Sequence, residues 1–507
     1  MAIKRNLLAN FLGQGWVAAM SLAFVPIYVA HLGVEAYALI GFYAVLQGWL
    51  ALLDFGMSPT LNRELARAST GTPTPTSIAD LLRSIEVICF VVAMLAAAAI
   101  WLASDWIARN WLDPQKLSPT TVAHAIAIMG LVIGLRFFEG IYRGALLGME
   151  RQAWFNAANA LLATIRYAGA AAVVVWVTPS IEAFFWFQAA MSLATIATFA
   201  AATHHWMPAA DRRGRFSVES LQTVASFATG LALTTLTGLL LTHVDKLMLA
   251  RLLSLKEFGE YMLAVALAGI FPMLIMPVAT AFYPPLTRAV AAGNDKDVVW
   301  NYHTAAELTA LLIAPALAIC VLLPDAVILA WTGNPSLAAD VGPLLRFLSI
   351  GMAANSLLQV PFALQLAHGW TNLPLRINCL AVAILLPSEY FAVQYFGAVG
   401  AAFVWALVNV AILPASAILM HRRLLASERS RWASRAVFLP LACSMTLVGI
   451  VAWLAPAMSS RLPAFEIILV AGIIALAGVS MCLPAIRQGV GSLRGSLRPV
   501  SIDRNDS

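Results

Sequence analysis

The sequence predicts an all-α protein that crosses a membrane many times, and three observations lead to this fold class. Of the 507 residues, 61% are hydrophobic and only 11% are charged, whereas soluble domains carry about 25% charged residues. Apolar stretches of about 20 residues recur along the chain, each long enough to cross about 30 Å of hydrocarbon. Lysine and arginine gather in alternate connections between these stretches. Since lipid offers no partner to unpaired backbone groups, each stretch is expected to be a helix.

We expect about fourteen transmembrane helices. The first follows a short basic start and is too long for a signal-peptide core, so it is expected to be retained as a span. The short external loops leave little chain outside the membrane. In chain order the expected spans are residues 6–30, 36–61, 84–104, 121–147, 153–177, 182–203, 221–250, 258–283, 302–330, 341–366, 373–395, 398–420, 436–456 and 464–486.

The basic residues give the spans a direction. Of the 31 lysines and arginines, 22 lie at the N-terminal side and in every second loop, and five lie in the opposite loops. Positive charge concentrates on the cytoplasmic side, so both termini are expected in the cytoplasm. The remaining four, inside spans, are Arg136, Arg166, Lys246 and Arg346.

A weak internal repeat predicts two pseudo-symmetric lobes of six helices each. At an offset of 221 residues, Gly48 matches Gly269 and Arg67 matches Arg288, in segments of similar hydropathy. Parallel repeats of this kind are typical of transporters. We therefore expect one lobe at residues 1–210, a second at 211–425, two additional helices at 426–488 and a disordered cytoplasmic tail at 489–507.

Several classes of function are disfavoured by what the chain lacks. The net charge of +6 is scattered through short loops, which does not indicate nucleic-acid binding. The five cysteines lie in apolar runs without paired spacing, so they are expected to pack rather than bind metal. The sequence has no HExxH, CxxC, GxSxG or Walker lysine motif. We expect no enzymatic activity, no cofactor and no metal.

Charged residues in the span 121–147 indicate where function lies. Arg136, Glu139 and Arg143 share one helix face, and Glu139 precedes Arg143 by four residues, a favourable pairing geometry. In the next span Arg166 shares a stripe with Asn156 and Asn159. A charge at bilayer depth must face a polar cavity or a partner.

These residues form either an ion-pair lattice that holds helices together or an anion site in a hydrated cavity. The anion site is favoured, because one carboxylate cannot neutralise three cations.

Other interior polar residues remain open between structural and functional roles. Asp245 and Lys246 follow one another on a helix, where neighbours point about 100° apart, so they are not expected to pair with each other. Asp245 is equally consistent with helix–helix contact and with a coupling site, and Lys246 with an anion site. Asp54 lies nearer the cytoplasmic end, where a structural role is favoured. Asn355 is a further expected polar residue of the cavity.

Three stretches resemble the polysaccharide (O-antigen) flippase family, Wzx-type, of the multidrug/oligosaccharidyl-lipid/polysaccharide exporter superfamily. The first contains HLGVE at residues 31–35 and LDFG at residues 53–56, the second YRG at 142–144 and GMER at 148–151, and the third HVDK at 243–246 and FGEY at 258–261. The resemblance covers about residues 1–425.

The resemblance implies an inner-membrane protein with two lobes around a central cavity that opens alternately to each side. Its cargo would be an undecaprenyl-diphosphate-linked oligosaccharide, moved from the cytoplasmic to the periplasmic leaflet. Arg136, Arg143, Arg166 and Lys246 would then bind the diphosphate, and Asp54, Glu139 and Asp245 would serve as coupling or ion-pair groups. A monomer, with a polysaccharide polymerase and chain-length proteins as partners, is also expected.

Three alternatives stay open. A cation-coupled multidrug exporter of the same superfamily would use Asp54, Glu139 or Asp245 to bind Na⁺ or H⁺. A lipid II flippase would share the number of spans, but the first span here carries no arginine. A polytopic membrane enzyme would need a sizeable external loop, which the short loops disfavour.

Overall fold

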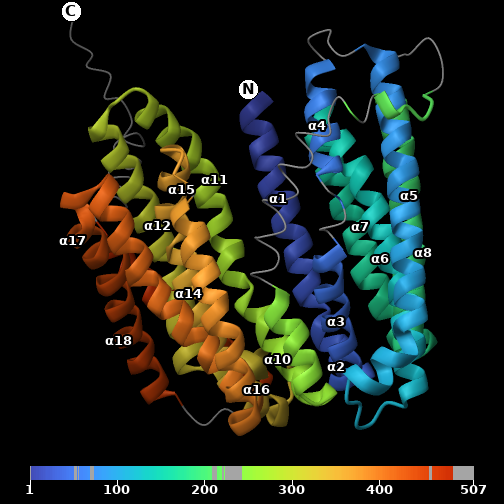
Figure 1. The fold of residues 1–507 in the computed structure, drawn as a ribbon. Helices are drawn as coiled ribbons and strands as arrows, with labels where there is room; N and C mark the ends of the chain where they lie inside the picture. The colour runs from blue at the N-terminus through green and yellow to red at the C-terminus, as the bar shows by residue number, and fades with distance from the viewer. Residues whose placement is uncertain are drawn as a thin grey trace, which may run out of the picture. The chain divides into compact units, whose positions relative to one another are not determined.

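The fold is all-helical over the residues that the structure, a computed structural model, describes: 2–50, 54, 56–68, 74–207, 214–219, 222, 243–370, 372–455 and 460–483. In these ranges the chain contains helices and short connections and no strand. This agrees with the fold class expected from an apolar chain in which every backbone group must find its partner within its own segment. Figure 1 shows the helices in chain order.

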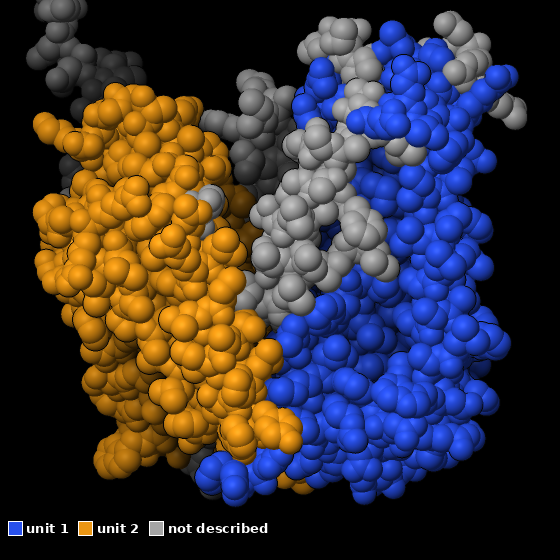
Figure 2. Space-filling view, in the orientation of Figure 1, with its two compact units in different colours: residues 1–263, 393–398 blue, residues 264–392, 399–507 orange. Residues whose placement is uncertain are grey.

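The chain divides into two compact units, residues 1–263 with 393–398 and residues 264–392 with 399–507 (Figure 2). The first contains α1 (Ala2–Ala23), α2 (Val25–Leu32), α3 (Val34–Leu50), α4 (Met57–Ala68), α5 (Pro75–Trp106), the π-helix η2 (Ile107–Trp111), α6 (Pro119–Gly148), α7 (Gln152–Ala172), the π-helix η3 (Val173–Val177), α8 (Ile181–Trp206) and the larger part of α10 (Leu255–Ala268). Residues 243–252 are also helical.

The second unit holds the remaining helices. They are α11 (Ile270–Ala291), α12 (Asp295–Leu322), α13 (Pro324–Thr332), α14 (Pro335–Leu357), α15 (Gln359–Ala367), most of α16 (Asn372–Leu424), η4 (Ala426–Glu428), α17 (Arg429–Trp432), η5 (Ala433–Phe438), α18 (Leu439–Leu454) and α19 (Arg461–Cys482). The two helices expected outside the repeat correspond to η4–α18 and α19, which pack on each other and on α12. The two units divide at residue 263, beyond the lobe boundary expected at residue 210. Residues 208–213, 223–242 and 484–507 lie outside the described ranges. The expected boundary at residue 210 and the expected disordered tail at 489–507 therefore stay predictions.

Eleven helices in the described part of the chain are long and apolar enough to cross a membrane. The figure of fourteen spans stays a prediction. The expected spans 373–395 and 398–420 correspond to the two helical segments of α16, which are separated by a kink at Gly397, where φ is 57° and ψ is −147°. Glycine tolerates this backbone conformation at no steric cost. The expected span 36–61 is divided between α3 and α4, and of the span 221–250 the described residues are 222 and 243–250.

Local sequence explains where several helices begin. Thr74, Ser118 and Asn334 each stand directly before a proline, and each side chain accepts a hydrogen bond from a backbone N–H in the first turn of α5, α6 or α14. Such side chains satisfy N–H groups that have no partner within the helix, and proline fits the first helical position because it has no N–H to satisfy. These starts are therefore encoded by neighbouring residues.

Helix α6 packs closely on α4 because glycine lines the contact. A Cβ atom on Gly144 would lie 2.6 Å from the carbonyl oxygen of Ser58, and one on Gly148 would lie 2.5 Å from that of Asn62. Small residues allow two membrane helices to bring their backbones together, and close packing replaces the hydrophobic driving force that lipid does not supply. The register of α4 on α6 depends on these two glycines.

Substitution of Gly148 should therefore destabilise unit 1. A Cβ at residue 148 also falls 2.9 Å from Cβ of Leu65, so we expect Gly148→Ala to reduce stability by about 1–3 kcal/mol through overpacking. The measurement is the midpoint of thermal unfolding in detergent. Gly140→Ala is the matched control on the same helix, because its Cβ would lie 3.6 Å from Oγ of Ser58. Equal midpoints for the two variants would contradict this account of the α4–α6 contact.

Candidate functional site

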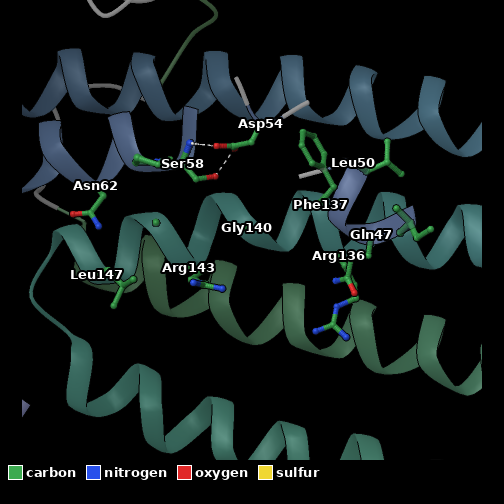
Figure 3. Close-up of a pocket in the computed structure, with 13 residues that line it drawn as sticks. Gln47, Leu50, Asp54, Ser58, Asn62, Arg136, Phe137, Gly140, Arg143 and Leu147 are labelled. Atoms are coloured by element: carbon green, nitrogen blue, oxygen red, sulfur yellow. Dashed lines mark hydrogen bonds between the residues drawn. The ribbon is translucent and has the colours of Figure 1, made fainter. Parts of the chain in front are cut away.

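Unit 1 contains a cavity of about 570 Å³ between α3, α4 and α6, lined by apolar and polar side chains. Its residues are spread along α6, with Asn62 and Leu147 at one end and Gln47 and Arg136 at the other (Figure 3). The lining consists of Gln47, Leu50, Asp54, Ser58, Pro59, Asn62, Ile133, Arg136, Phe137, Gly140, Arg143, Gly144 and Leu147. The volume lies within the range of about 300–1,000 Å³ that is common for ligand pockets.

Two arginines from α6 supply positive charge to the cavity. Arg136 is partly buried and Arg143 is exposed, and both guanidinium groups leave α6 on the same side (Figure 3). Residues seven apart lie on one face of a helix, separated by about 10 Å along the axis. Among the described residues neither arginine lies within ion-pair distance of a carboxylate. The cavity is therefore lined by two cations that form no direct ion pair with a described residue.

Asp54 also lines the cavity, but its carboxylate accepts hydrogen bonds from Ser58 at the start of α4. Its oxygens accept hydrogen bonds from the backbone N–H of Ser58, at 3.2 Å each, and Oδ1 accepts another from Oγ of Ser58 at 2.7 Å. A negative charge is favourable at a helix N-terminus, where N–H groups lack helical partners. This contact fits the structural role favoured for Asp54.

Arg166, on α7, does not belong to the lining of the cavity. It is only 4% exposed. Its Nη2 lies 3.5 Å from Oε2 of Glu139 and donates a hydrogen bond to Oγ1 of Thr195 at 2.8 Å. The spacing of Glu139 and Arg143 on α6 is also favourable for an ion pair, but the direct partner of Glu139 is Arg166, on the neighbouring helix.

Asp245 and Lys246 also depart from expectation. They had not been expected to pair, yet Nζ of Lys246 lies 2.9 Å from Oδ2 and 3.2 Å from Oδ1 of Asp245. Both residues are buried, at 2% and 8% exposure. The angular separation of neighbouring Cβ atoms does not prevent contact, because the long flexible lysine side chain can bend back. Burial of either charge without the other would leave an uncompensated charge, which is strongly destabilising.

None of the three asparagines expected as polar cavity residues lines the cavity of unit 1. Asn156 is buried in α7, where its Nδ2 donates to the carbonyl of Gln152, and a Cβ on Gly13 of α1 would lie 2.9 Å from its Cβ. Asn159 is partly buried in the same helix. Asn355 belongs to unit 2, where its Nδ2 lies 3.4 Å from Oδ1 of Asn409. Sequence periodicity does not reveal which neighbour each helix face meets.

Gln47, Ser58 and Asn62 line the cavity but had not been singled out from the sequence. A signal was present for two of them. Asp54, Ser58 and Asn62 follow one another at intervals of four residues, which places them along one side of a helix. The hydroxyl group of Tyr43, which also had not been singled out from the sequence, lies close enough to Arg136 to interact with it electrostatically.

The capping role of Asp54 can be tested by comparing two substitutions. Asp54→Asn retains a side-chain oxygen that accepts from Ser58, whereas Asp54→Ala removes it. We expect Asp54→Ala to lower the free energy of unfolding by about 1 kcal/mol and Asp54→Asn to lower it by less than half as much. Thermal unfolding in detergent measures both. Equal losses would show that the contact with Ser58 does not stabilise α4.

Comparison with known proteins places the chain in a family. Residues 3–290, more than half of the chain, match the sequence profile of the family described as polysaccharide biosynthesis protein. Residues 230–391 match the profile named MatE. A protein of Shigella flexneri described as an O-antigen transporter is 20% identical over 412 residues, which cover 80% of this chain and 95% of that protein.

Solved structures share the fold. The lipid II flippase MurJ in an inward closed conformation superposes with a TM-score of 0.72 at 10% identity, over 95% of this chain and 99% of its own. An inward-facing multidrug resistance MATE family transporter of the MOP superfamily gives a TM-score of 0.66 at 15% identity, over 83% of this chain and 96% of its own. The eleven spans and the family match are those of a multi-pass transporter in the bacterial inner membrane. The chain belongs to the polysaccharide biosynthesis protein family.

Proposed function

We propose that this protein is a flippase that moves an undecaprenyl-diphosphate-linked oligosaccharide from the cytoplasmic to the periplasmic leaflet by alternating access. The translocated oligosaccharide would be used to synthesise a cell-surface polysaccharide. The observation that carries the proposal is the cavity in unit 1, where Arg136 and Arg143 form no direct ion pair with a carboxylate among the described residues. The described function of the Shigella flexneri relative supports the same class of cargo.

A diphosphate is the anion that this cavity suits best. Arginine presents several N–H donors in a planar fork that matches phosphate oxygens, and such charge-assisted bonds are stronger than neutral ones. Arg136 and Arg143 are seven residues apart, so two long side chains can approach one diphosphate from both ends. The amides of Gln47 and Asn62, which also line the cavity, are suitable partners for hydroxyl groups of the first sugar.

The cavity is large enough for the polar head of the cargo but not for its lipid tail. A volume of about 570 Å³ holds a diphosphate and an adjoining sugar, but not a long polyprenyl chain. The chain is apolar and loses nothing by remaining in the hydrocarbon, whereas the charged head must be shielded from it. Only the head therefore needs a path through the protein.

A cation-coupled multidrug exporter is the second candidate, because residues 230–391 match the MatE profile and Asp54 places a carboxylate in the cavity. In that function Asp54 would take up and release the coupling cation. Asp54→Asn would then abolish transport although it preserves the contact with Ser58. In the flippase the same variant should retain transport, and loss of the gene should leave sensitivity to cationic dyes unchanged.

The main prediction concerns the two arginines. In a strain that lacks the gene, Arg136→Ala and Arg143→Ala should each restore surface polysaccharide at least about tenfold less well than the unchanged protein, because the diphosphate loses a charged hydrogen-bond partner. The measurement is the amount of surface glycan, normalised to the amount of protein in the membrane. Arg109→Ala is the matched control, because Arg109 is an exposed arginine outside the cavity. Its Nη2 atom lies 3.4 Å from Oδ1 of Asp105, four residues earlier in the chain.

Lysine should preserve part of the function. Arg136→Lys and Arg143→Lys keep the positive charge but lose the planar fork, so glycan levels are expected between those of the alanine variants and the unchanged protein. Full glycan export by a folded double variant, Arg136→Ala with Arg143→Ala, would show that the cavity does not bind the cargo.

A further inference from the structure

We propose that Arg166 is a positioning residue that holds the carboxylate of Glu139 away from the two arginines of the cavity. It thereby keeps Arg136 and Arg143 available to the diphosphate. This inference rests on the proposed function, since it concerns the same cavity, but it assigns a separate role to a residue that lies outside the lining.

The sequence of α6 places a carboxylate between the two arginines of the cavity. Glu139 stands three residues after Arg136 and four before Arg143, so it is a neighbour of both on the helix surface. A glutamate four residues ahead of a basic residue is the favourable orientation for an ion pair within a helix. Taken alone, α6 would pair Glu139 with one of its own arginines and remove half of the positive charge of the cavity.

The structure shows a different partner. Glu139 lies within ion-pair distance of Arg166 alone among the described residues, at 3.5 Å between Oε2 and Nη2. Both side chains are largely withdrawn from solvent, at 5% exposure for Arg166 and 13% for Glu139. An interaction between charges is stronger in such surroundings than at an exposed site, because water screens it less. Arg166 therefore competes well with the more exposed Arg143.

Thr195, on α8, fixes the position of Arg166. The Nη2 atom that faces Glu139 also donates to Oγ1 of Thr195 at 2.8 Å, and the Thr195 hydroxyl donates in turn to the carbonyl of Met191 at 2.7 Å. Thr195 is 1% exposed, so the chain of contacts is enclosed. Thr195, which does not line the cavity, thus holds the guanidinium of Arg166 between α6 and α8.

The consequence is a division of charge between two places. Glu139 makes its direct ion pair with Arg166 and interacts with Arg136 only over a longer distance, so Arg136 and Arg143 line the cavity without a direct ion pair. A purely structural ion pair would hold α6 and α7 together but would have no effect on how an anion binds in the cavity. The two roles therefore differ in what happens when both members of the pair are made neutral.

The test compares pyrophosphate binding by the purified full-length protein, measured by isothermal titration calorimetry with inorganic pyrophosphate. Arg166→Met should weaken binding by about tenfold, because Glu139 is released toward Arg136 and Arg143. Arg166→Met combined with Glu139→Gln should bind within about threefold of the unchanged protein, since no carboxylate remains to compete. Arg166→Lys, which keeps a cation for Glu139, should also stay within about threefold.

A structure of the Arg166→Met protein separates repositioning from a simple change in electric field. We expect the Glu139 carboxylate within about 4 Å of a guanidinium of Arg136 or Arg143, the usual limit for an ion pair. If Glu139 keeps its position, the inference is overturned even when binding weakens. Should Arg166→Met not fold, Thr195→Val, which removes only the hydroxyl that holds Arg166, should weaken binding by about threefold, and Glu139→Gln should reverse this effect.

Failure of this inference is distinguishable from failure of the proposed function. If the double variant Arg136→Ala with Arg143→Ala still binds pyrophosphate, the cavity is not the diphosphate site and the proposed function loses its support. If that variant loses binding while Arg166→Met binds normally, the cavity remains the proposed diphosphate site and the role proposed for Arg166 is wrong. Unchanged binding in Arg166→Met together with a displaced Glu139 would equally overturn the role.

Discussion

The exclusion of isolated charge from hydrocarbon is the constraint on which unit 1 depends. An arginine at the centre of a membrane helix costs at least about 2.5–3.5 kcal/mol unless it finds a partner or a polar space. The protein uses both solutions in neighbouring helices. Arg166 is enclosed with Glu139 and Thr195, and Arg136 faces a cavity of about 570 Å³. The position of each charge thus determines whether it is paired within the bundle or faces the cavity.

Helix α6 provides both the walls and the space of this cavity. At Gly144 and Gly148 it allows the backbone of α4 to approach closely, which fixes the distance between the two helices. Gly140 and Gly144 also belong to the lining, and the absence of side chains at these residues leaves volume that larger residues would fill. The close packing of α4 and the volume of the cavity therefore depend on the same run of small residues.

The fold alone does not determine the cargo. The same arrangement of helices is found in the lipid II flippase MurJ and in a MATE family multidrug transporter, which carry chemically different molecules according to their names. Function on a shared fold is decided by the side chains of the site. In this chain those side chains are two arginines with polar neighbours, and the one carboxylate of the lining, Asp54, is engaged with the start of α4.

The sequence by itself determined the helical, membrane-spanning character of the chain, because apolar length and the need to satisfy backbone groups are local properties. The expected span 121–147 falls within α6, and the arrangement of Arg136, Glu139 and Arg143 on one face follows from helical periodicity. The tertiary structure alone decided which partner each charge takes. Glu139 meets Arg166, and Lys246 bends back to Asp245, because such choices depend on the approach of neighbouring helices and on side-chain rotation, which no pattern along a single helix records.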